Sequence, residues 1–486
     1  MEQQKALAEI VGPEHVSDEP GVIEAFSKDH SFARACEPCC VVRPGDAGQV
    51  EAIVKWANEA RSPLIPVSSG PPHFRGDTVP VLGGVAVDLS RINAIRMIDR
   101  PERVAMIEPG VRFGELQTAL EKEGLRLPAP LSPRSSKSVL ASCLEREPHI
   151  IPKYHLDHSE PLLCLEVVFG TGDVLRTGDA AGPGSIEEQW EAGRRQKQHM
   201  GVMTDEFRYI QGAQGSMGIV TWATVRCEVL PALQEPFLAA SDDLEPLLDL
   251  ASQLVRLRLG DELFILNDHQ LALLLGNTRD SVEALRRALP RWILFFCVAG
   301  YEYLPEERVE YQKSDAARVA ERVGIPLERA ISGVSARDVL QRAAHPSGEP
   351  YWKLNHGGGC QDIPFISSYH DLPGLVATIT DAVIASRGYP LSDLGGYIQP
   401  VCQGHGYHCE LSLSYDPGNP LDSAVVKELY VTASEALMCK GAFFSRPYDL
   451  LTSRVLNRDA ATRDALKTLK AIHDPHNIMN PGRLVQ

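Results

Sequence analysis

Hydrophobic and polar residues alternate with two different periods along this chain, which predicts both helices and strands. In residues 49–61 the apolar side chains Val50, Ile53 and Ala57 recur at intervals of three or four, which places them on one face of a helix. The apolar run 64–69 that follows is typical of a buried strand. A helix that leads directly into a buried strand indicates a mixed architecture from the first hundred residues onward.

Further segments follow the same two periods, and polar residues stand where two of the helices begin. Asp46 precedes the helix at 49–61 and Ser335 precedes another, each at a position where its side chain can cap the helix. Residues 170–173, Gly-Thr-Gly-Asp, predict the turn of a hairpin. Strands are expected at 85–89, 104–108, 162–169, 174–177 and 292–298, and helices at 113–123, 316–323 and 336–344.

One glycine-rich stretch, 209–231, predicts a close approach of the backbone to another group. Gly212, Gly215 and Gly218 lie three residues apart, and a β-branched run follows them. Glycine permits left-handed dihedrals and leaves room for a neighbour against the backbone. The pattern therefore predicts a loop beside a flat or charged group, followed by a strand. A glycine-spaced turn that enters a buried strand would produce the same pattern.

Composition excludes several functional classes. The chain of 486 residues is 44% hydrophobic and 23% charged, typical of two or three globular domains. Its formal net charge of −16 argues against nucleic acid as a partner. No apolar run reaches the roughly 18 residues of a membrane span, and the first residues lack a signal peptide, so we expect a soluble, cytoplasmic protein. Cys36, Cys39 and Cys40 lack a second half with matching ligands, and we predict no metal site.

The order of motifs resembles one flavoprotein family. The chain is similar to the FAD-dependent vanillyl-alcohol oxidase/p-cresol methylhydroxylase superfamily over essentially its whole length. Within that superfamily the vanillyl-alcohol oxidase and cresol dehydrogenase branch is the nearest. The motifs that carry the resemblance are RPGD at 43–46, LIPVSSG at 64–70, IEPGVRFGELQTAL at 107–120, EVVFGTGDVLRTG at 166–178, GAQGSMGIVTWATV at 212–225 and DPHNIMNPGRL at 474–484.

The resemblance implies an α+β fold and FAD as the cofactor. It implies an FAD-binding domain of two α+β subdomains at 1–234 with its core at 36–231, an antiparallel-sheet cap domain at 235–440, and a returning segment at 441–486. FAD would lie against the loop at 66–80, the segment 130–142 and the glycine-rich stretch. The cofactor-binding residues expected on this basis are Ser68, Ser69, Gly70, His73, Ser138, Ser142, Gly212, Gly215, Gly218, Ile219, Val220 and Asn480. Whether FAD is covalently attached, through His73 for example, stays open.

Catalytic candidates come from the resemblance and from a strand pattern. The resemblance places Asp157 and His158 on an acid–base pair that faces the flavin. It also places Arg446 on an arginine that holds an anionic substrate oxygen, with Tyr448 nearby. In the strand GHGYHCELSLSY, His408 and Glu410 share one face. That face favours a substrate cavity; a metal site that includes His405, or an acid–base pair, would fit as well.

Together these features predict an FAD-dependent oxidoreductase that removes a hydride from a small anionic or phenolic substrate, of the alkylphenol or aromatic alcohol type. A 2-hydroxy-acid dehydrogenase of the same superfamily is the first alternative, in which His405 and His408 would matter more. A non-catalytic subunit of an electron-transfer complex is the second, because Pro71 and Pro72 remove two backbone donors from the phosphate loop. The resemblance further implies a protein electron acceptor, a cytochrome or an iron–sulfur subunit, and a homodimer.

Overall fold

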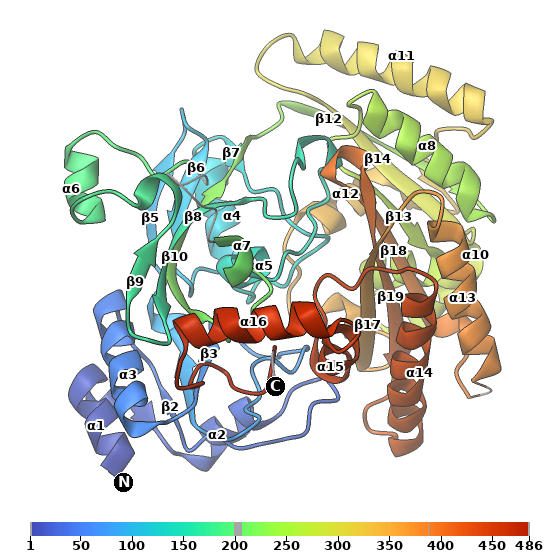
Figure 1. The fold of residues 1–486 in the computed structure, drawn as a ribbon. Helices are drawn as coiled ribbons and strands as arrows, with labels where there is room; N and C mark the ends of the chain where they lie inside the picture. The colour runs from blue at the N-terminus through green and yellow to red at the C-terminus, as the bar shows by residue number, and fades with distance from the viewer. Residues whose placement is uncertain (1, 199–206, 387, 485–486) are drawn as a thin grey trace.

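The computed structural model describes residues 2–198, 207–386 and 388–484, which form an amino-terminal part and a cap (Figure 1). Helices and strands mix in both parts, and the predicted α+β fold class is confirmed. In the part of the chain that the structure describes, no helix has the length and apolar character needed to cross a bilayer.

Two sheets build the amino-terminal part. In the first, β2, β3 and β4 run parallel and β1 is antiparallel to β2; in the second, β10 lies at the centre of five antiparallel strands. The first sheet, in the order β1-β2-β4-β3, contains Val16–Ser17, Cys40–Val42, Val85–Asp88 and Leu64–Val67. The second, in the order β5-β6-β10-β8-β9, contains Ile95–Asp99, Val104–Ile107, Gly218–Arg226, Leu162–Phe169 and Val174–Arg176. The predicted hairpin at 162–177 is β8 and β9.

Two helices of this part were predicted with bounds: α4 begins at Phe113 as predicted, and α3 begins at Ala47, two residues before the predicted start. The backbone N–H of Gln49 donates to Asp46 at 2.8 Å, so Asp46 caps α3, and Val50, Ile53 and Ala57 are buried as predicted. Short strands β7 (Leu125–Arg126) and β11 (Glu228–Val229) pair near the border with the cap. The helices are α1 (Glu2–Val11), α2 (Pro20–Ser27), α3 (Ala47–Ala60), α4 (Phe113–Lys122), α5 (Val139–Leu144), α6 (Ile186–Glu191) and α7 (Phe207–Ile210).

A six-stranded antiparallel sheet forms the cap. Its order is β12-β14-β13-β18-β19-β17. Alternate residues of β19 face opposite sides, and the odd-numbered ones, such as Tyr407 and Cys409, pack into the core between the sheet and α8, α11, α13 and α14. The even-numbered side, which carries His408 and Glu410, faces the amino-terminal part. The strands are β12 (Leu233–Ser241), β13 (Leu263–Asn267), β14 (Trp292–Gly300), β17 (Gly359–Ser367), β18 (Leu394–Val401) and β19 (Gly406–Tyr415).

Helices cover both faces of the cap sheet. Ser335 caps α12, as predicted. Helix α11 is longer than the predicted 316–323, because its first half is a charged surface segment whose apolar stripe is too sparse to detect. The cap helices are α8 (Leu244–Arg256), α9 (Asp268–Leu275), α10 (Arg279–Ala288), α11 (Pro305–Val323), α12 (Ala336–Ala344), α13 (Leu372–Ala385) and α14 (Pro420–Cys439), and a small hairpin pairs β15 (Ala330–Ile331) with β16 (Val334–Ser335).

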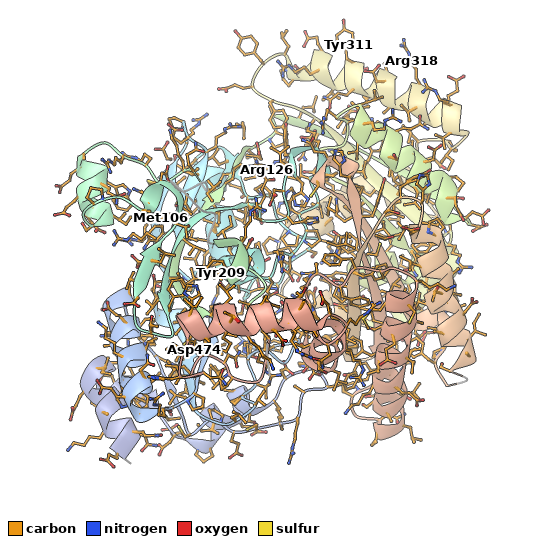
Figure 2. The ribbon with its side chains drawn as sticks, in the orientation of Figure 1. Met106, Arg126, Tyr209, Tyr311, Arg318 and Asp474 are labelled. Atoms are coloured by element: carbon orange, nitrogen blue, oxygen red, sulfur yellow. The ribbon has the colours of Figure 1, made fainter. Side chains whose placement is uncertain are left out.

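The chain returns to the amino-terminal part through α15 (Thr452–Leu456) and α16 (Ala460–His473), which crosses in front of both parts in Figure 1. Asp474, labelled in Figure 2, fixes the turn after α16. Its buried carboxylate accepts hydrogen bonds from the backbone N–H groups of Ile478 and Met479 and pairs with Lys470 at 2.8 Å. The turn brings Met479 beside Leu64 of β3.

Arg126 ties the cap to the amino-terminal part (Figure 2). Its guanidinium lies at the end of β7, 3.3 Å from Asp261, and also donates to Glu262; both carboxylates precede β13 and are almost fully buried. Lys153 pairs with Asp261 at 2.6 Å. Burial alone would lower the pKa of Arg126, but Glu262, Tyr301 and Asp261 raise it above its usual range. The interface between the two parts is therefore held by buried ion pairs.

Candidate active site

Two adjoining cavities, of about 200 and 110 Å³, share part of their lining between the cap and the glycine-rich stretch, and together they are called the channel. Because both cavities are bounded by the loop after β3 and by α5, the channel runs along the face of the amino-terminal part. The residues common to both linings are Pro66, Ser68, Asp77, Ala141, Glu145 and Tyr448.

The smaller cavity lies against the glycines that the sequence singled out. Gly212 and Gly215 have φ values of 75° and 69°. A Cβ on Gly215 would stand 2.5 Å from Cγ of Pro66, so a larger residue is excluded on steric as well as conformational grounds. Gly218, which begins β10, lines the same cavity with Ile219 and Val220. The predicted close approach of backbone to a neighbouring group is thus present at these positions.

The loop after β3 forms the opposite wall. Ser68 and Ser69 line the larger cavity, and the Oγ of Ser69 accepts a hydrogen bond from the backbone N–H of Ser138 at 3.2 Å. Gly70 donates its N–H to the carbonyl of Ser136 at 3.2 Å. His73 is buried in this wall, where desolvation and Arg134 lower its pKa to about 4, so its ring is neutral.

Three of the predicted cofactor residues stand behind the lining and support it. Ser138 donates to the carbonyl of Pro109 at 2.6 Å and caps α5. Ser142 donates to Glu147 at 2.7 Å. Asn480 donates to the carbonyls of Asp77 and Gln214, both at 2.8 Å, and so connects the returning tail to the two walls of the channel.

Four charged side chains meet at the middle of the channel. Arg75 contacts Glu145 and Glu147 at 2.5 Å, and Lys137 contacts the same carboxylates at 2.7 and 2.8 Å. Burial alone would raise the pKa of Glu147, but Lys137, Arg75 and Arg446 hold it well below its usual range. The guanidinium of Arg75 also lies 5.1 Å from the ring centroid of Tyr448. The two positive and two negative side chains in this group sum to zero net charge.

Glu410 is held ionised at the cap wall. Lys353 contacts Glu410 at 2.5 Å and Asp362 at 2.7 Å, and all three residues line the larger cavity. Burial alone would raise the pKa of Glu410, but Lys353, His408 and Arg446 lower it far below its ordinary value. Glu410 is therefore an acceptor of hydrogen bonds and a weak base.

His408 and Arg446 converge on the same carboxylate. The Nε2 atom of His408 lies 3.9 Å from Glu410, and the guanidinium of Arg446 lies 4.0 Å from it. Among the described residues, Nε2 of His408 has no hydrogen-bond partner, although the side chain is buried. Burial is the largest influence on His408 and lowers its pKa, and Arg446 lowers it further. The ring is therefore a neutral imidazole with a nitrogen available to a ligand.

The guanidinium of Arg446 can donate further hydrogen bonds to a ligand. Its hydrogen bond to the carbonyl of Glu145 is long, at 3.4 Å, and the side chain is only 4% exposed. Aromatic side chains surround it on the walls of the larger cavity, and burial raises the pKa of Tyr448, so the phenol stays protonated. The aromatic lining consists of Phe74, Tyr351, Trp352, Tyr397, Tyr430, Phe444 and Tyr448.

The structure separates the predicted pair Asp157 and His158. Asp157 is absent from the linings of the three cavities beside the cap wall; it pairs with Arg208 at 3.1 Å and accepts the backbone N–H of Ser159 at 2.8 Å. His158 lines a third cavity, of about 140 Å³, that His408 and Arg446 also border. The structure brings the predicted residues His408, Glu410 and Arg446 together. The cavity is also lined by Lys353, Arg75 and Glu147, which carry no local motif and were not predicted from the sequence.

The residues of the channel fit the FAD that the sequence resemblance implies. The two cavities of the channel share lining residues from the glycine wall to the cap wall. A Cβ at Gly212, Gly215 or Gly218 would clash with neighbouring protein atoms. Gln214, in that wall, has a buried Oε1 without a hydrogen-bond partner among the described residues, which a ribose hydroxyl could supply. Arg75 and Lys137 line the larger cavity and would supply cations to a pyrophosphate in exchange for their ion pairs with Glu145 and Glu147.

Comparison with known proteins gives a consistent result. A family model described as an FAD binding domain matches residues 38–178. The glycolate oxidase subunit GlcD of Bacillus subtilis is 21% identical, over 99% of this chain and 96% of its own length. The 4-cresol dehydrogenase [hydroxylating] flavoprotein subunit of Pseudomonas putida is 31% identical over 30% of this chain and 28% of its own. The structure of p-cresol methylhydroxylase with substrate bound superimposes with a TM-score of 0.85 at 19% identity, covering 100% of this chain and 96% of that one.

Proposed function

We propose that the chain is an FAD-dependent oxidoreductase of the vanillyl-alcohol oxidase/p-cresol methylhydroxylase superfamily and that its substrate is a small alkylphenol or aromatic alcohol; the FAD binding domain match and the likeness to p-cresol methylhydroxylase and the 4-cresol dehydrogenase subunit support this. The observation that carries this proposal is a buried guanidinium beside an unpartnered neutral imidazole in an aromatic-lined cavity. We further propose, from the resemblance, that a separate redox protein accepts the electrons.

Arg446 and His408 act on the same substrate oxygen. Both side chains line the larger cavity and lie within 4.0 Å of Glu410, and we place the phenolic oxygen of the substrate between them. His408 accepts the hydroxyl proton at Nε2, since Glu410 is held ionised by Lys353 and binds a proton only weakly. Arg446 then stabilises the phenolate, because a guanidinium offers several donors to an oxyanion.

FAD, when bound, supplies the hydride acceptor. This chain's own residues hold and orient it: the wall that begins at Gly212, the loop of Ser68 and Ser69, and the tail through Asn480. The aromatic side chains Tyr397 and Phe444 exclude water around the substrate ring. The substrate proton goes to His408 and the hydride goes to FAD, so the two transfers have different acceptors.

A substrate panel with the purified flavoprotein under anaerobic conditions tests the proposal. We expect p-alkylphenols to bleach the flavin absorbance, and the matching O-methyl ethers to leave it unchanged. The ethers keep the ring and the alkyl group but have no proton for His408 and no oxyanion for Arg446. Bleaching of equal rate by an ether would contradict the assigned roles.

The 2-hydroxy acids are the second candidate substrates, and one observation favours them. The relatives that cover nearly the whole chain include proteins named for glycolate and for D-2-hydroxyglutarate. A carboxylate would suit Arg446 as well as a phenolate does, and the alcohol proton would again pass to His408. If glycolate or lactate bleaches the flavin while every alkylphenol leaves it oxidised, this candidate replaces the first.

Replacing Arg446 by methionine is expected to lower kcat/KM for the best phenol roughly 10- to 100-fold, the effect of losing a charged hydrogen bond to substrate. Lysine at 446 should restore part of the loss, because the charge returns without the forked geometry. The matched control is Arg458→Met in the exposed turn after α15. Steady-state kinetics check the result, and an unaltered KM and kcat in Arg446→Met would remove Arg446 from the site.

A further inference from the structure

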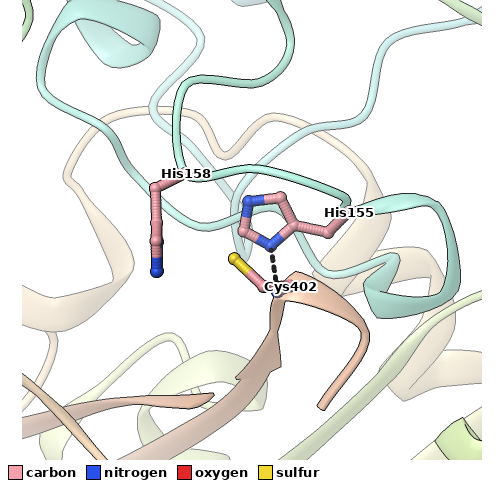
Figure 3. A group of neighbouring side chains, drawn as sticks. All are labelled: His155, His158 and Cys402. Carbon is pink, nitrogen blue, oxygen red and sulfur yellow. Dashed lines mark hydrogen bonds between the residues drawn. The ribbon is translucent and has the colours of Figure 1, made fainter. Parts of the chain in front are cut away.

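A second group of side chains, outside the flavin channel, converges in a way that the proposed oxidation does not use. The ligand atoms that His155, His158 and Cys402 offer all lie within 4.8 Å of one another. Figure 3 shows the thiol between the two imidazole rings. His155 is buried, Cys402 is partly buried and His158 is exposed at the edge of the group.

The group joins the two parts of the molecule. His155 and His158 belong to the segment between the turn Pro152–Tyr154 and β8, whereas Cys402 begins the turn Cys402–Gly404 after cap strand β18. The backbone N–H of Cys402 donates to Nδ1 of His155 at 3.2 Å (Figure 3). The neighbouring Gln403 donates its side-chain amide to the carbonyl of Lys153 at 3.2 Å. The two segments are thus already held in register.

His149, next to the group, adds an independent observation. It is fully buried, and neither ring nitrogen has a hydrogen-bond partner among the described residues. Its ring centroid lies 4.4 Å from that of His155. Buried polar groups without a partner are rare in native proteins, so the surroundings of His155 contain polar atoms that no described residue satisfies.

One side of the group is open to a cavity. His155 and His158 line the cavity of about 140 Å³, whose other wall includes His408 and Arg446. Three protein ligands with an open fourth position are typical of zinc sites that contact a substrate or water, whereas structural zinc sites have four protein ligands. Asp157 and Glu160 flank the histidines with negative charge, and Arg146 and Arg446 border the cavity with positive charge.

We propose that His155, His158 and Cys402 bind a divalent transition-metal ion of the zinc class through two imidazole nitrogens and one thiolate. Imidazole and thiolate donors select such an ion over magnesium or calcium. The thiol of Cys402 releases its proton to solvent as the ion binds. His155 binds the ion through Nδ1, whose lone pair becomes available when the 3.2 Å hydrogen bond from the N–H of Cys402 opens. The ion links the cap to the amino-terminal part and presents its open position to the cavity beside the substrate site. The site is independent of which substrate the flavin oxidises.

Cobalt titration of the full flavoprotein, after removal of metal by a chelator and dialysis, tests the site. We expect one Co²⁺ per chain, with d–d bands at wavelengths beyond the flavin absorbance that indicate a low-symmetry thiolate site. Zn²⁺ should displace the cobalt and abolish these bands. Elemental analysis of the equilibrated protein gives the stoichiometry without reference to activity.

Substitutions of the proposed ligands test which residues bind the ion. Cys402→Ser and His158→Asn should each weaken cobalt binding by about tenfold or more. Cys439→Ser and His370→Asn replace an exposed thiol and an exposed imidazole away from the group and should bind like the wild type. Wild type that takes up no cobalt, or Cys402→Ser that binds it as tightly as wild type with the same spectrum, would overturn the proposal.

Discussion

His408→Asn is expected to lower the rate constant for flavin reduction by substrate about 10²- to 10⁴-fold, the usual contribution of a positioned general base. Asparagine fills a similar space beside Glu410 and Tyr397 but cannot accept a proton at the position of Nε2. Anaerobic stopped-flow mixing with the best phenol measures the rate constant directly. Substrate affinity should change much less, because Arg446 can still donate a hydrogen bond to the neutral phenolic oxygen.

The same variant should alter the pH dependence. Burial and Arg446 place the pKa of His408 below its ordinary value of 6.5, and only the neutral ring accepts a proton. In the wild type the rate therefore stays level as the pH falls through 6.5 and decreases only when the pH passes below the lowered pKa. In His408→Asn this decrease of the rate constant at low pH, the acid limb of the profile, should be absent. His370→Asn, on an exposed turn, is the control; an unchanged limb in His408→Asn would assign the titration to another group.

Local patterns predicted much of this fold because each depends on neighbours in sequence. The cap of α3 by Asp46 and the alternation of β19 need only a few adjacent residues, so helix and strand positions follow from them. The three-residue spacing of the glycines indicated that position 215 requires glycine. The physical cause is the tertiary contact with Pro66, which the sequence does not show. The alternation in β19 also predicted that His408 and Glu410 face the cavity.

The remaining site residues meet only in three dimensions. Lys353 lies in a short turn without a motif and is 57 positions from Glu410 in the sequence. Its contact with Glu410 in the folded chain keeps that carboxylate ionised. Cys402 and His155 are 247 positions apart. Asp157 was placed by counting along a loop, and loops of different length shift such an alignment; in the structure it pairs with Arg208 outside the channel. Charge complementarity across long loops leaves no periodic signal in the sequence.

Arg126→Met is expected to have the largest effect on stability, lowering the free energy of unfolding by about 3–5 kcal/mol, the usual consequence of removing one partner of a buried ion pair. Methionine keeps the volume of the side chain but leaves Glu262 buried without a cation. Asp261 keeps a cationic partner in this variant, because Lys153 still contacts it at 2.6 Å. Calorimetry should show a lower midpoint for the transition that separates the cap from the amino-terminal part.

Two further variants separate the charge from the packing in this interface. Arg463→Met removes a partly exposed surface arginine that pairs with Asp464 at 3.1 Å, and it should lower the free energy of unfolding by about 0–1 kcal/mol. Adding Glu262→Gln to Arg126→Met should recover a large share of the lost stability, because the buried charge disappears while the amide retains hydrogen-bonding capacity. If the double variant is no more stable than Arg126→Met, the loss arises from packing around the guanidinium, and the ion pairs contribute little to holding the cap over the channel.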